Sequence, residues 1–392
     1  MKIILAGGGS GGHITPLLAV ADSLRSSQQD LKIIHIGQRG EQLDSVMRHH
    51  SIDESVGITA GKFRRYNGES FVSHLLDIKT IVLNARDLLR FVRGTVQAWR
   101  LLGRVKPDAI LLKGGYVCVP VGFAARLRRI PYMTHDSDAI PGLANRITAG
   151  AAQYNAVAMP VGGYPYETTK VVQTGIPIRP EFQPVTASVR NTSKKELGYK
   201  STDKLLFVVG GGLGARNVNI AVSEIAQKAL EAHTSLHVVQ ITGKTLYDET
   251  KALYASMPIA LQSRVHLIDF TTDLYKYSAA ADVVIARAGA TNLAEFAIQK
   301  KPTILIPNPV LTGGQQLHNA EIVRAANAAI IVDEGDVDAL EQSVHHMFSL
   351  SDVDRQMYGS SLSGVMPIHA AAQIISDMLI AIGSGTAYER TS

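Results

Sequence analysis

Apolar residues in this chain gather in short runs, each followed by glycine or polar residues. Such runs, bounded by turn-forming residues, predict buried β-strands. In the first half, the predicted strands are Lys2–Ala6, Leu31–Gly37, Ala109–Leu112 and Tyr132–Thr134. In the second half, they are Leu205–Val209, His237–Ile241, Val265–Ile268, Val283–Ala286, Thr303–Ile306 and Ala329–Val332.

Segments of helical character lie between these runs. Thr15-Pro16 predicts a helix start, because a hydroxyl residue caps a helix and proline fits its first position. His74–Arg104 predicts one long basic helix or two shorter ones, and Gly122–Arg128 another helix. The tail Met366–Ile382 is apolar and helical, with Asp377 near its middle. Alternating strands and helices predict the α/β class, with doubly wound parallel sheets.

This alternation starts twice along the chain. Between the two series lies Thr174–Pro180, a segment rich in proline and glycine that predicts a domain boundary. We expect one Rossmann-like domain over 1–174 and a second over 175–365, with the tail 366–392 packing back on the first. A chain of 392 residues, 46% of them hydrophobic, suits two such domains.

Composition excludes several classes of protein. A single cysteine, Cys118, excludes a disulfide framework and a cysteine-based metal site, and favours a reducing compartment. The opening apolar run is too short for a signal peptide. Glycine, proline and polar residues break the two uncharged stretches, 147–166 and 356–376. We therefore expect neither stretch to span a membrane.

Positive charge is concentrated in residues 62–106. This stretch holds ten basic residues against Glu69, Asp77 and Asp87, interleaved with apolar residues that include Phe91 and Trp99. Such a segment predicts an acidic partner, either nucleic acid or an anionic membrane surface. No recognised nucleic-acid motif accompanies the charge, which favours the membrane. A solvated basic helix face is the structural alternative.

Two glycine-rich loops follow the first predicted strand of each half, at Gly7–His13 and Gly210–Arg216. Glycines there permit a tight turn and close approach of the backbone to a phosphate at a helix N-terminus. A nicotinamide site is disfavoured because no aspartate or glutamate follows the second strand to bind the ribose. A P-loop is disfavoured because His13 stands where that motif has its lysine. Two such loops predict two Rossmann-like domains that face each other across a cleft, although a simple tight turn remains the alternative.

Three further segments carry candidate chemistry. Residues 286–295 end a strand and start a helix, so backbone amides near Thr291 suit a phosphate and Glu295 suits ribose hydroxyls. The amides of 311–319 suit sugar hydroxyls. Helix capping is the alternative for both segments. The Asp-x-Asp pattern of 135–138 recurs at 336–338 and 352–354, which makes a metal site there a weak hypothesis. His13, at the first loop, is a candidate base.

Over nearly its whole length, the chain resembles the MurG family, the undecaprenyl-diphospho-muramoylpentapeptide β-N-acetylglucosaminyltransferases of peptidoglycan synthesis. The motifs that carry this resemblance are 7–21, 113–117, 135–142, 174–179, 210–219, 282–295 and 315–319. The resemblance implies the GT-B fold of glycosyltransferase family 28. It also implies inverting transfer of N-acetylglucosamine from UDP-GlcNAc to lipid I at the cytoplasmic face of the membrane, with no metal or other cofactor required.

The resemblance also assigns roles to residues. His13 and Asp136 are the implied catalytic residues. The implied loop for the acceptor diphosphate comprises Gly8, Gly9, Ser10, Gly114, Gly115 and Tyr116. The implied donor-binding residues are Ser10, Gly11, Gly12, Asp138, Arg179, Gly212, Thr271, Arg287, Gly289, Ala290, Thr291, Glu295, Gln315, Gln316 and Asn319.

The chain departs from the family pattern at several of these positions. It has Gly212-Leu213 where members usually have Ser-Gln, Asp136 for Glu, Asp138 for a neutral amide and Ala288 for Ser. These departures keep other functions open. The alternatives are a related transferase with another lipid acceptor, a UDP-N-acetylglucosamine 2-epimerase, and a UDP-sugar-binding protein without catalysis. A nicotinamide-dependent oxidoreductase is disfavoured by the missing ribose acid.

Overall fold

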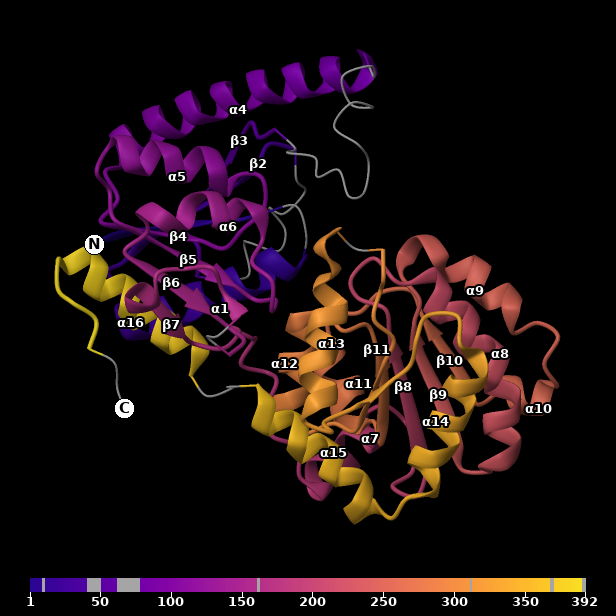
Figure 1. Ribbon diagram of the computed structural model, residues 1–392. Helices are drawn as coiled ribbons and strands as arrows, with labels where there is room; N and C mark the ends of the chain where they lie inside the picture. The colour runs from indigo at the N-terminus through magenta and orange to yellow at the C-terminus, as the bar shows by residue number, and fades with distance from the viewer. Residues whose placement is uncertain are drawn as a thin grey trace. The chain divides into compact units, whose positions relative to one another are not determined.

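The computed structural model describes residues 1–8, 11–40, 51–61, 78–160, 163–310, 312–366 and 370–389. The chain divides into two compact units (Figure 1). Unit 1 comprises Met1–Arg179 together with His369–Ser392, and unit 2 comprises Pro180–Ile368. Each unit is an α/β domain built on one parallel sheet.

Unit 1 contains a seven-stranded parallel sheet in the order β3-β2-β1-β4-β5-β6-β7. The strands are β1 Lys2–Ala6, β2 Lys32–Gln38, β3 Glu54–Ile58, β4 Ala109–Leu112, β5 Tyr132–Asp136, β6 Tyr154–Val157 and β7 Val171–Gln173. The helices are α1 Gly11–Ser27, α4 Ile78–Val105, α5 Cys118–Leu127, α6 Leu143–Thr148 and α16 Ala371–Ser384, with short 3₁₀ turns η1 Ala149–Ala151 and η3 Thr168–Lys170.

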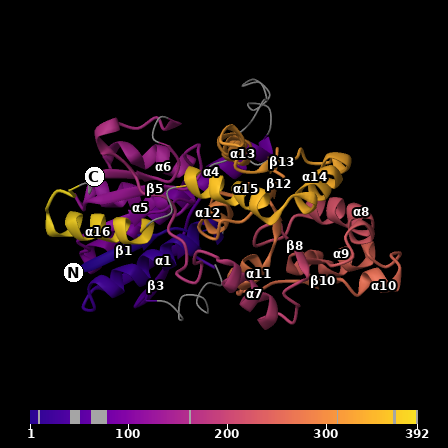
Figure 2. The same cartoon turned by 90° about the horizontal axis from the view of Figure 1, so that it is seen from below.

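The core of unit 1 lies on both faces of this sheet. One face packs against α4 and α5 through residues such as Ala98, Leu102 and Val121, all fully buried. On the other face, α16 lies beside α1 (Figures 1 and 2) and buries Ile375 and Leu379. The last helix of the chain therefore completes the core of the first domain.

Unit 2 contains a six-stranded parallel sheet in the order β10-β9-β8-β11-β12-β13. The strands are β8 Lys204–Val209, β9 Leu236–Ile241, β10 Val265–Ile268, β11 Val283–Ala286, β12 Thr303–Leu305 and β13 Ile330–Ile331. Its helices are α7 Ala187–Glu196, α8 Arg216–Ala232, α9 Tyr247–Leu253, α10 Ile259–Gln262, α11 Leu274–Ala280, α12 Ala290–Ile298, α13 Gln315–Ala325, α14 Val337–Ser349 and α15 Asp352–Val365, with 3₁₀ turns η4 Lys244–Leu246 and η5 Thr312–Gly314.

All ten predicted strands are confirmed, with ends that differ by a few residues. The prediction missed β3, β6 and β7, of which the last two are short. The predicted helix start at Thr15 is wrong, because α1 begins at Gly11 and contains Pro16. A proline this close to a helix start removes only one backbone hydrogen bond, so the helix extends back into the glycines.

The long basic segment forms one helix rather than two over its described part, Ile78–Val105, and residues 62–77 lie outside the described residues. The tail helix begins at Ala371 rather than Met366, because Ala370 adopts a left-handed conformation with φ of 62°. Among the described residues, no helix is both long and apolar enough to span a bilayer.

Candidate functional site

In each sheet, the strand order reverses direction at one point, between β1 and β4 in unit 1 and between β8 and β11 in unit 2. Loops that leave the carboxyl ends of neighbouring parallel strands diverge at such a point and leave a crevice where ligands bind. Both predicted glycine loops follow a strand that borders this point. Each unit therefore has one candidate subsite at the carboxyl edge of its own sheet.

In unit 1, glycines let two loops approach closely. A side chain at Gly115 would lie 2.4 Å from the carbonyl oxygen of Gly8, and one at Gly7 would lie 2.8 Å from Leu17. Gly114 and Gly115 also have positive φ, which residues with a side chain rarely adopt. Gly8, Gly114, Gly115 and Tyr116 are thus gathered at the carboxyl edge as the acceptor-loop assignment requires. Gly9 and Ser10 lie outside the described residues.

His13 stands in the first turn of α1, after Gly11 and Gly12, and its ring packs over Gly114. A side chain at Gly114 would lie 3.0 Å from the Cε1 atom of His13. Burial of the ring and the nearby Lys113 ammonium lower the pKa of His13 to about 3. The imidazole is therefore neutral at physiological pH, and its Nδ1 atom has no hydrogen-bond partner within the described residues. A neutral ring with an unpartnered nitrogen is able to accept a proton or a hydrogen bond.

Asp136 ends β5 and is buried. Its carboxylate accepts hydrogen bonds from the backbone N–H of Gly142 at 3.1 Å, from Asn145 Nδ2 at 2.9 Å and from the Tyr166 hydroxyl at 2.6 Å. None of these hydrogen bonds involves His13. Burial raises the pKa of Asp136 despite these donors and Lys113. The carboxylate therefore organises the loop after β5, and the structure does not pair it directly with His13.

Lys113 links these groups, although no role was predicted for it from the sequence. It follows β4, only 3% of it is exposed, and its Nζ atom donates to Ser137 Oγ at 2.8 Å. Burial lowers the pKa of Lys113, and the carboxylates of Asp136 and Asp138 partly oppose that effect. The sequence contains a signal for this role, because Lys113 stands directly after an apolar strand and before two glycines.

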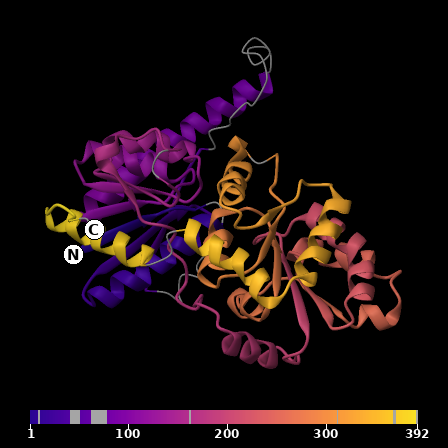
Figure 3. The ribbon, with the colours of Figure 1, turned by 60° about the horizontal axis from the view of Figure 1, so that its bottom comes forward.

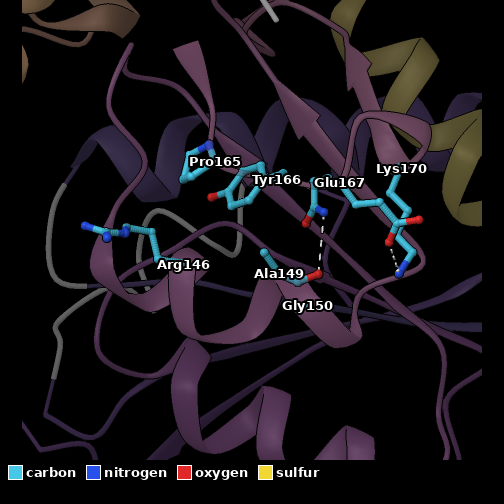
Figure 4. Close-up of a pocket in the computed structure, with 8 residues that line it drawn as sticks. Arg146, Ala149, Gly150, Pro165, Tyr166, Glu167 and Lys170 are labelled. Carbon is cyan, nitrogen blue, oxygen red and sulfur yellow. Dashed lines mark hydrogen bonds and ion pairs between the residues drawn. The ribbon is translucent and has the colours of Figure 1, made fainter. Parts of the chain in front are cut away.

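Tyr166 also lines a cavity of about 310 Å³ between α6–η1 and the segment 165–170 (Figure 4). Arg146 and the ion pair of Lys170 with Glu167, at 2.9 Å, lie on its walls. The Tyr166 ring stacks on Tyr164, whose hydroxyl donates to the Asp138 carbonyl at 2.8 Å. The stacked pair of Tyr164 and Tyr166 therefore holds both carboxylate residues, Asp136 by its side chain and Asp138 by its backbone.

In unit 2, two helices begin without a side-chain cap at the point where the strand order reverses. The N-cap residue of α8 is Ala215 and that of α12 is Gly289, and neither supplies a side-chain hydrogen bond. The first backbone N–H groups of each helix, including those of Ala290 and Thr291 in α12, are thus available to an anion. Two such helix ends suit a diphosphate.

The glycine loop between β8 and α8 has two kinds of position. A side chain at Gly214 would lie 2.0 Å from the carbonyl oxygen of Thr242, and Gly211 has a φ of 99°. Gly212, by contrast, has no atom within 4 Å of an added Cβ and lacks a positive φ. A serine, which the resemblance to the MurG family leads us to expect at 212, would therefore fit there.

The amides of α13 serve the fold around the candidate donor site. Gln316 Oε1 accepts from the backbone N–H of Asn308 at 2.8 Å, and Asn319 Nδ2 donates to the Ala288 carbonyl at 3.0 Å. Gln315 starts the same helix and is partly exposed. These bonds tie α13 both to the loop after β11 and to the loop after β12.

Three other predicted donor residues have different surroundings. Arg287 is buried, donates to the Ile306 carbonyl at 3.0 Å and pairs with Glu334, so its guanidinium holds strand ends together. Glu295 is buried one turn into α12. Thr271 accepts the backbone N–H of Asp273 at 3.0 Å in the loop after β10. Arg179 and Asp138 belong to unit 1.

The other Asp-x-Asp patterns begin helices. Asp336 caps α14 by accepting the Ala339 N–H at 3.0 Å, and Asp352 begins α15. Among the described residues, no group of three His, Cys, Asp or Glu side chains has the geometry of a metal site.

Models of two domains of one protein family match the chain. Residues 3–157 match the glycosyltransferase family 28 N-terminal domain, and residues 205–366 match the glycosyltransferase family 28 C-terminal domain. The chain belongs to glycosyltransferase family 28. The matched ranges contain the glycine loops of both units, so the family model and the geometry agree on the two Rossmann-like domains.

Curated family 28 relatives match most of the chain. A protein of Natranaerobius thermophilus is 31% identical over 87% of this chain and 89% of its own length. Another from Halalkalibacterium halodurans is 32% identical over 86% and 87% respectively. Both are named UDP-N-acetylglucosamine--N-acetylmuramyl-(pentapeptide) pyrophosphoryl-undecaprenol N-acetylglucosamine transferase.

Solved structures identify the fold. Acinetobacter baumannii MurG superposes with a TM-score of 0.70 at 23% identity, covering 97% of this chain and 99% of that one. Staphylococcus aureus MnaA superposes with a TM-score of 0.65 at 13% identity, covering 100% and 99%. The predicted GT-B fold is confirmed, and so is the prediction that this family 28 protein is a glycosyltransferase.

Proposed function

We propose that this family 28 enzyme transfers N-acetylglucosamine from UDP-GlcNAc to lipid I, undecaprenyl-diphospho-N-acetylmuramoyl-pentapeptide, to form lipid II with inversion at the sugar. The observation that carries the proposal is the identity of 31–32% over about nine-tenths of the chain with relatives that bear this activity in their names. The arrangement of each unit is consistent with the two substrates.

The donor is assigned to the carboxyl edge of unit 2. Backbone N–H groups at the starts of α8 and α12 face the diphosphate, Glu295 takes the ribose hydroxyls, and the start of α13 meets the sugar. Preorganised N–H groups stabilise the negative charge that develops on the departing UDP. The mechanism proposed here therefore needs no metal or other cofactor.

The acceptor is assigned to the carboxyl edge of unit 1. The backbone N–H groups of Gly7 and Gly114 already donate to the Ile36 carbonyl and to Cys118 Sγ. Gly8 and Gly115 carry no side chain that would obstruct their own backbone N–H groups, which suits a lipid diphosphate. His13 acts on the acceptor hydroxyl as a base or as an orienting hydrogen-bond acceptor. An approaching diphosphate offsets the charge of Lys113, which raises the basicity of His13 when the acceptor is bound.

The membrane surface is assigned to α4 and α5. Leu88, Val92, Val96 and Trp99 recur at helical spacing along α4 and are 43–57% exposed. Exposed Phe123 and Leu127 extend this apolar strip onto α5, which lies alongside α4 (Figures 1 and 3). A second stripe of α4 carries the basic side chains Arg86, Arg90, Arg93, Arg100 and Arg104.

Adjacent apolar and basic stripes suit a helix that lies in the surface of an anionic bilayer. We propose peripheral attachment of the enzyme through this surface at the cytoplasmic face of the cell membrane, where an undecaprenyl-linked acceptor is reached. The charge is assigned to lipid and not to nucleic acid.

The test is UDP release from UDP-GlcNAc in detergent, with and without a short-chain lipid I analogue, with and without EDTA. Release that needs the analogue and persists in EDTA supports the proposal. Formation of a disaccharide product, followed by mass spectrometry, distinguishes transfer from hydrolysis. Binding of UDP-GlcNAc without acceptor-dependent release of UDP contradicts the proposal. Epimerisation of the donor in the absence of acceptor indicates a 2-epimerase instead.

A further inference from the structure

A second cavity lies in unit 2, at the opposite edge of its sheet from the candidate donor site. It has a volume of about 690 Å³ and lies between the start of α7, the turn after α12, and α15. Lys301, which lines the cavity, lies two residues before β12, so the cavity is at the amino edge of the sheet. Asp282, which directly precedes β11, lies at the same edge. Nothing in the proposed transfer reaction uses this edge.

Positive charge exceeds negative charge around the cavity. Asp282 already pairs with Lys194 at 2.8 Å, and Asp352 already pairs with Lys204 at 3.1 Å and with Arg355. Arg190 lies 3.6 Å from each of these two carboxylates, too far for a hydrogen bond. Its charge is therefore shared between carboxylates that have closer partners.

Lys301 adds a buried amine that forms no ion pair with a carboxylate among the described residues, although Asp282 lies close enough to act on its pKa. Its Nζ atom donates to the carbonyl oxygens of Ala279 at 2.7 Å and Ala281 at 2.9 Å. Burial and the neighbouring Arg190 lower the pKa of Lys301 to about 7. An anion that enters a site where the pKa of a lysine is lowered in this way stabilises the protonated form of that lysine.

Two polar side chains that line the cavity have unused hydrogen-bonding atoms. The Nε–H of Arg190 is buried and has no acceptor within the described residues. Gln299 is 2% exposed, and its Nε2 donates to the Tyr275 carbonyl at 2.9 Å, which fixes the amide orientation. Its Oε1 atom is left without a donor in the described part of the chain. A buried donor and a buried acceptor without partners indicate a ligand that supplies both.

We propose that this cavity binds a small phosphate monoester, with the phosphoryl group on Arg190 and a hydroxyl of the ligand on Gln299. Ser360 and Ser361 line the same cavity and offer further hydroxyl donors. Val353, which is 75% exposed, and Met357, which is 63% exposed, form an apolar wall for the organic part of the ligand. The site is independent of the donor and acceptor subsites.

The experiment uses the full chain with its methionine methyl groups labelled with ¹³C and with the donor site saturated by UDP. Inorganic phosphate and phenyl phosphate are titrated, and the Met357 resonance, assigned with Met357→Leu, is followed. We expect a saturable shift, with tighter binding of phenyl phosphate than of inorganic phosphate. No shift at Met357 overturns the proposal.

Two variants test the site. Arg190→Gln removes the charge that meets the phosphoryl group, and we expect binding about tenfold weaker or more. Val353→Asp places a carboxylate at an exposed position of the wall, where folding is unaffected, and we expect a similar loss. The matched controls are Arg324→Gln and Ile259→Asp, both exposed in unit 2 and neither among the residues that line the cavity. Equal binding by Val353→Asp and Ile259→Asp overturns the proposal.

Discussion

At the residue scale, the structure would accommodate a side chain at Gly212, although the sequence has glycine there. Its backbone has no positive φ and its surroundings leave space for a side chain. We expect Gly212→Ser to fold normally and to lower the KM for UDP-GlcNAc by up to about tenfold, because it adds a hydroxyl donor beside the start of α8. Steady-state kinetics measure this effect.

The control is Gly211→Ser, one residue away. Gly211 has a φ of 99°, so a side chain there introduces backbone strain. We expect this variant to lower the melting temperature and not to lower the KM for UDP-GlcNAc. If Gly212→Ser and Gly211→Ser behave alike, the hydroxyl has no phosphate to meet and the donor assignment of this loop is wrong.

His13 carries the proton-transfer proposal at the same scale. We expect His13→Ala to lower kcat by roughly 10²–10⁴ while the Kd for UDP-GlcNAc, assigned to unit 2, stays within about threefold. Single-turnover assays and titration calorimetry measure the two quantities separately. A kcat equal to that of the parent enzyme removes His13 from the mechanism.

The depressed pKa of His13 also predicts a pH dependence of stability. Its pKa falls from 6.5 to about 3 on folding, so the unfolded chain binds more protons between these values. The free energy of unfolding of unit 1 therefore rises with pH across this window and falls as the pH drops from 6.5 towards 3. His13→Gln should flatten that slope in urea unfolding at pH 4, 5 and 6. An unchanged slope would show that His13 titrates normally.

At the element scale, α4 combines a tight inner face with two exposed stripes. Its inner face packs so closely that a side chain at Gly94 would lie 2.0 Å from the Thr59 carbonyl oxygen. The outer side carries the apolar and basic stripes. Because the helix is fixed by its inner face, its outer side is held in position for the proposed contact with a bilayer surface.

The membrane proposal is tested on those stripes. We expect the double variant Arg90→Ser/Arg93→Ser to bind vesicles rich in phosphatidylglycerol at least tenfold more weakly, at about 1 kcal/mol per basic residue. Leu88→Ser/Val92→Ser should weaken binding to a similar degree through loss of apolar burial. Flotation measures both, with exposed Val353→Ser of α15 as the control. Equal flotation of all variants and the parent contradicts the assignment.

At the scale of the whole molecule, the chain returns from unit 2 to finish the core of unit 1. Leu379 of α16 is fully buried among residues of α1 and the sheet. We expect Leu379→Ala to destabilise unit 1 by about 2–5 kcal/mol and to leave unit 2 unchanged. Scanning calorimetry with and without UDP-GlcNAc resolves the two units, since ligand stabilises only the unit that binds it.

The control for this prediction is Ile259→Ala, whose side chain is 84% exposed in unit 2. It should move neither transition. A downward shift of both transitions in Leu379→Ala would mean that the two units unfold as one, and the described division of the chain would then have no thermodynamic counterpart.

The sequence by itself determined the features that depend on neighbouring residues. Strands, glycine loops and most helices follow from apolar runs, turn residues and periodicity, and both glycine loops were located in this way. The missed strands β6 and β7 and the misplaced start of α1 are short or terminal features, where local preference is weak. The family also followed from the sequence, because its motifs are contiguous segments.

Only the tertiary structure decided how distant side chains combine. Tyr166 binds Asp136 from 30 positions away, Arg287 pairs with Glu334 from 47 positions away, and α16 covers α1. Lys113 lowers the pKa of His13 because β1 and β4 are neighbours in the sheet, although a hundred residues separate the two side chains in the chain. Hydrogen bonds and charge interactions act over a few ångströms of space, and only the order of the strands sets which residues come that close.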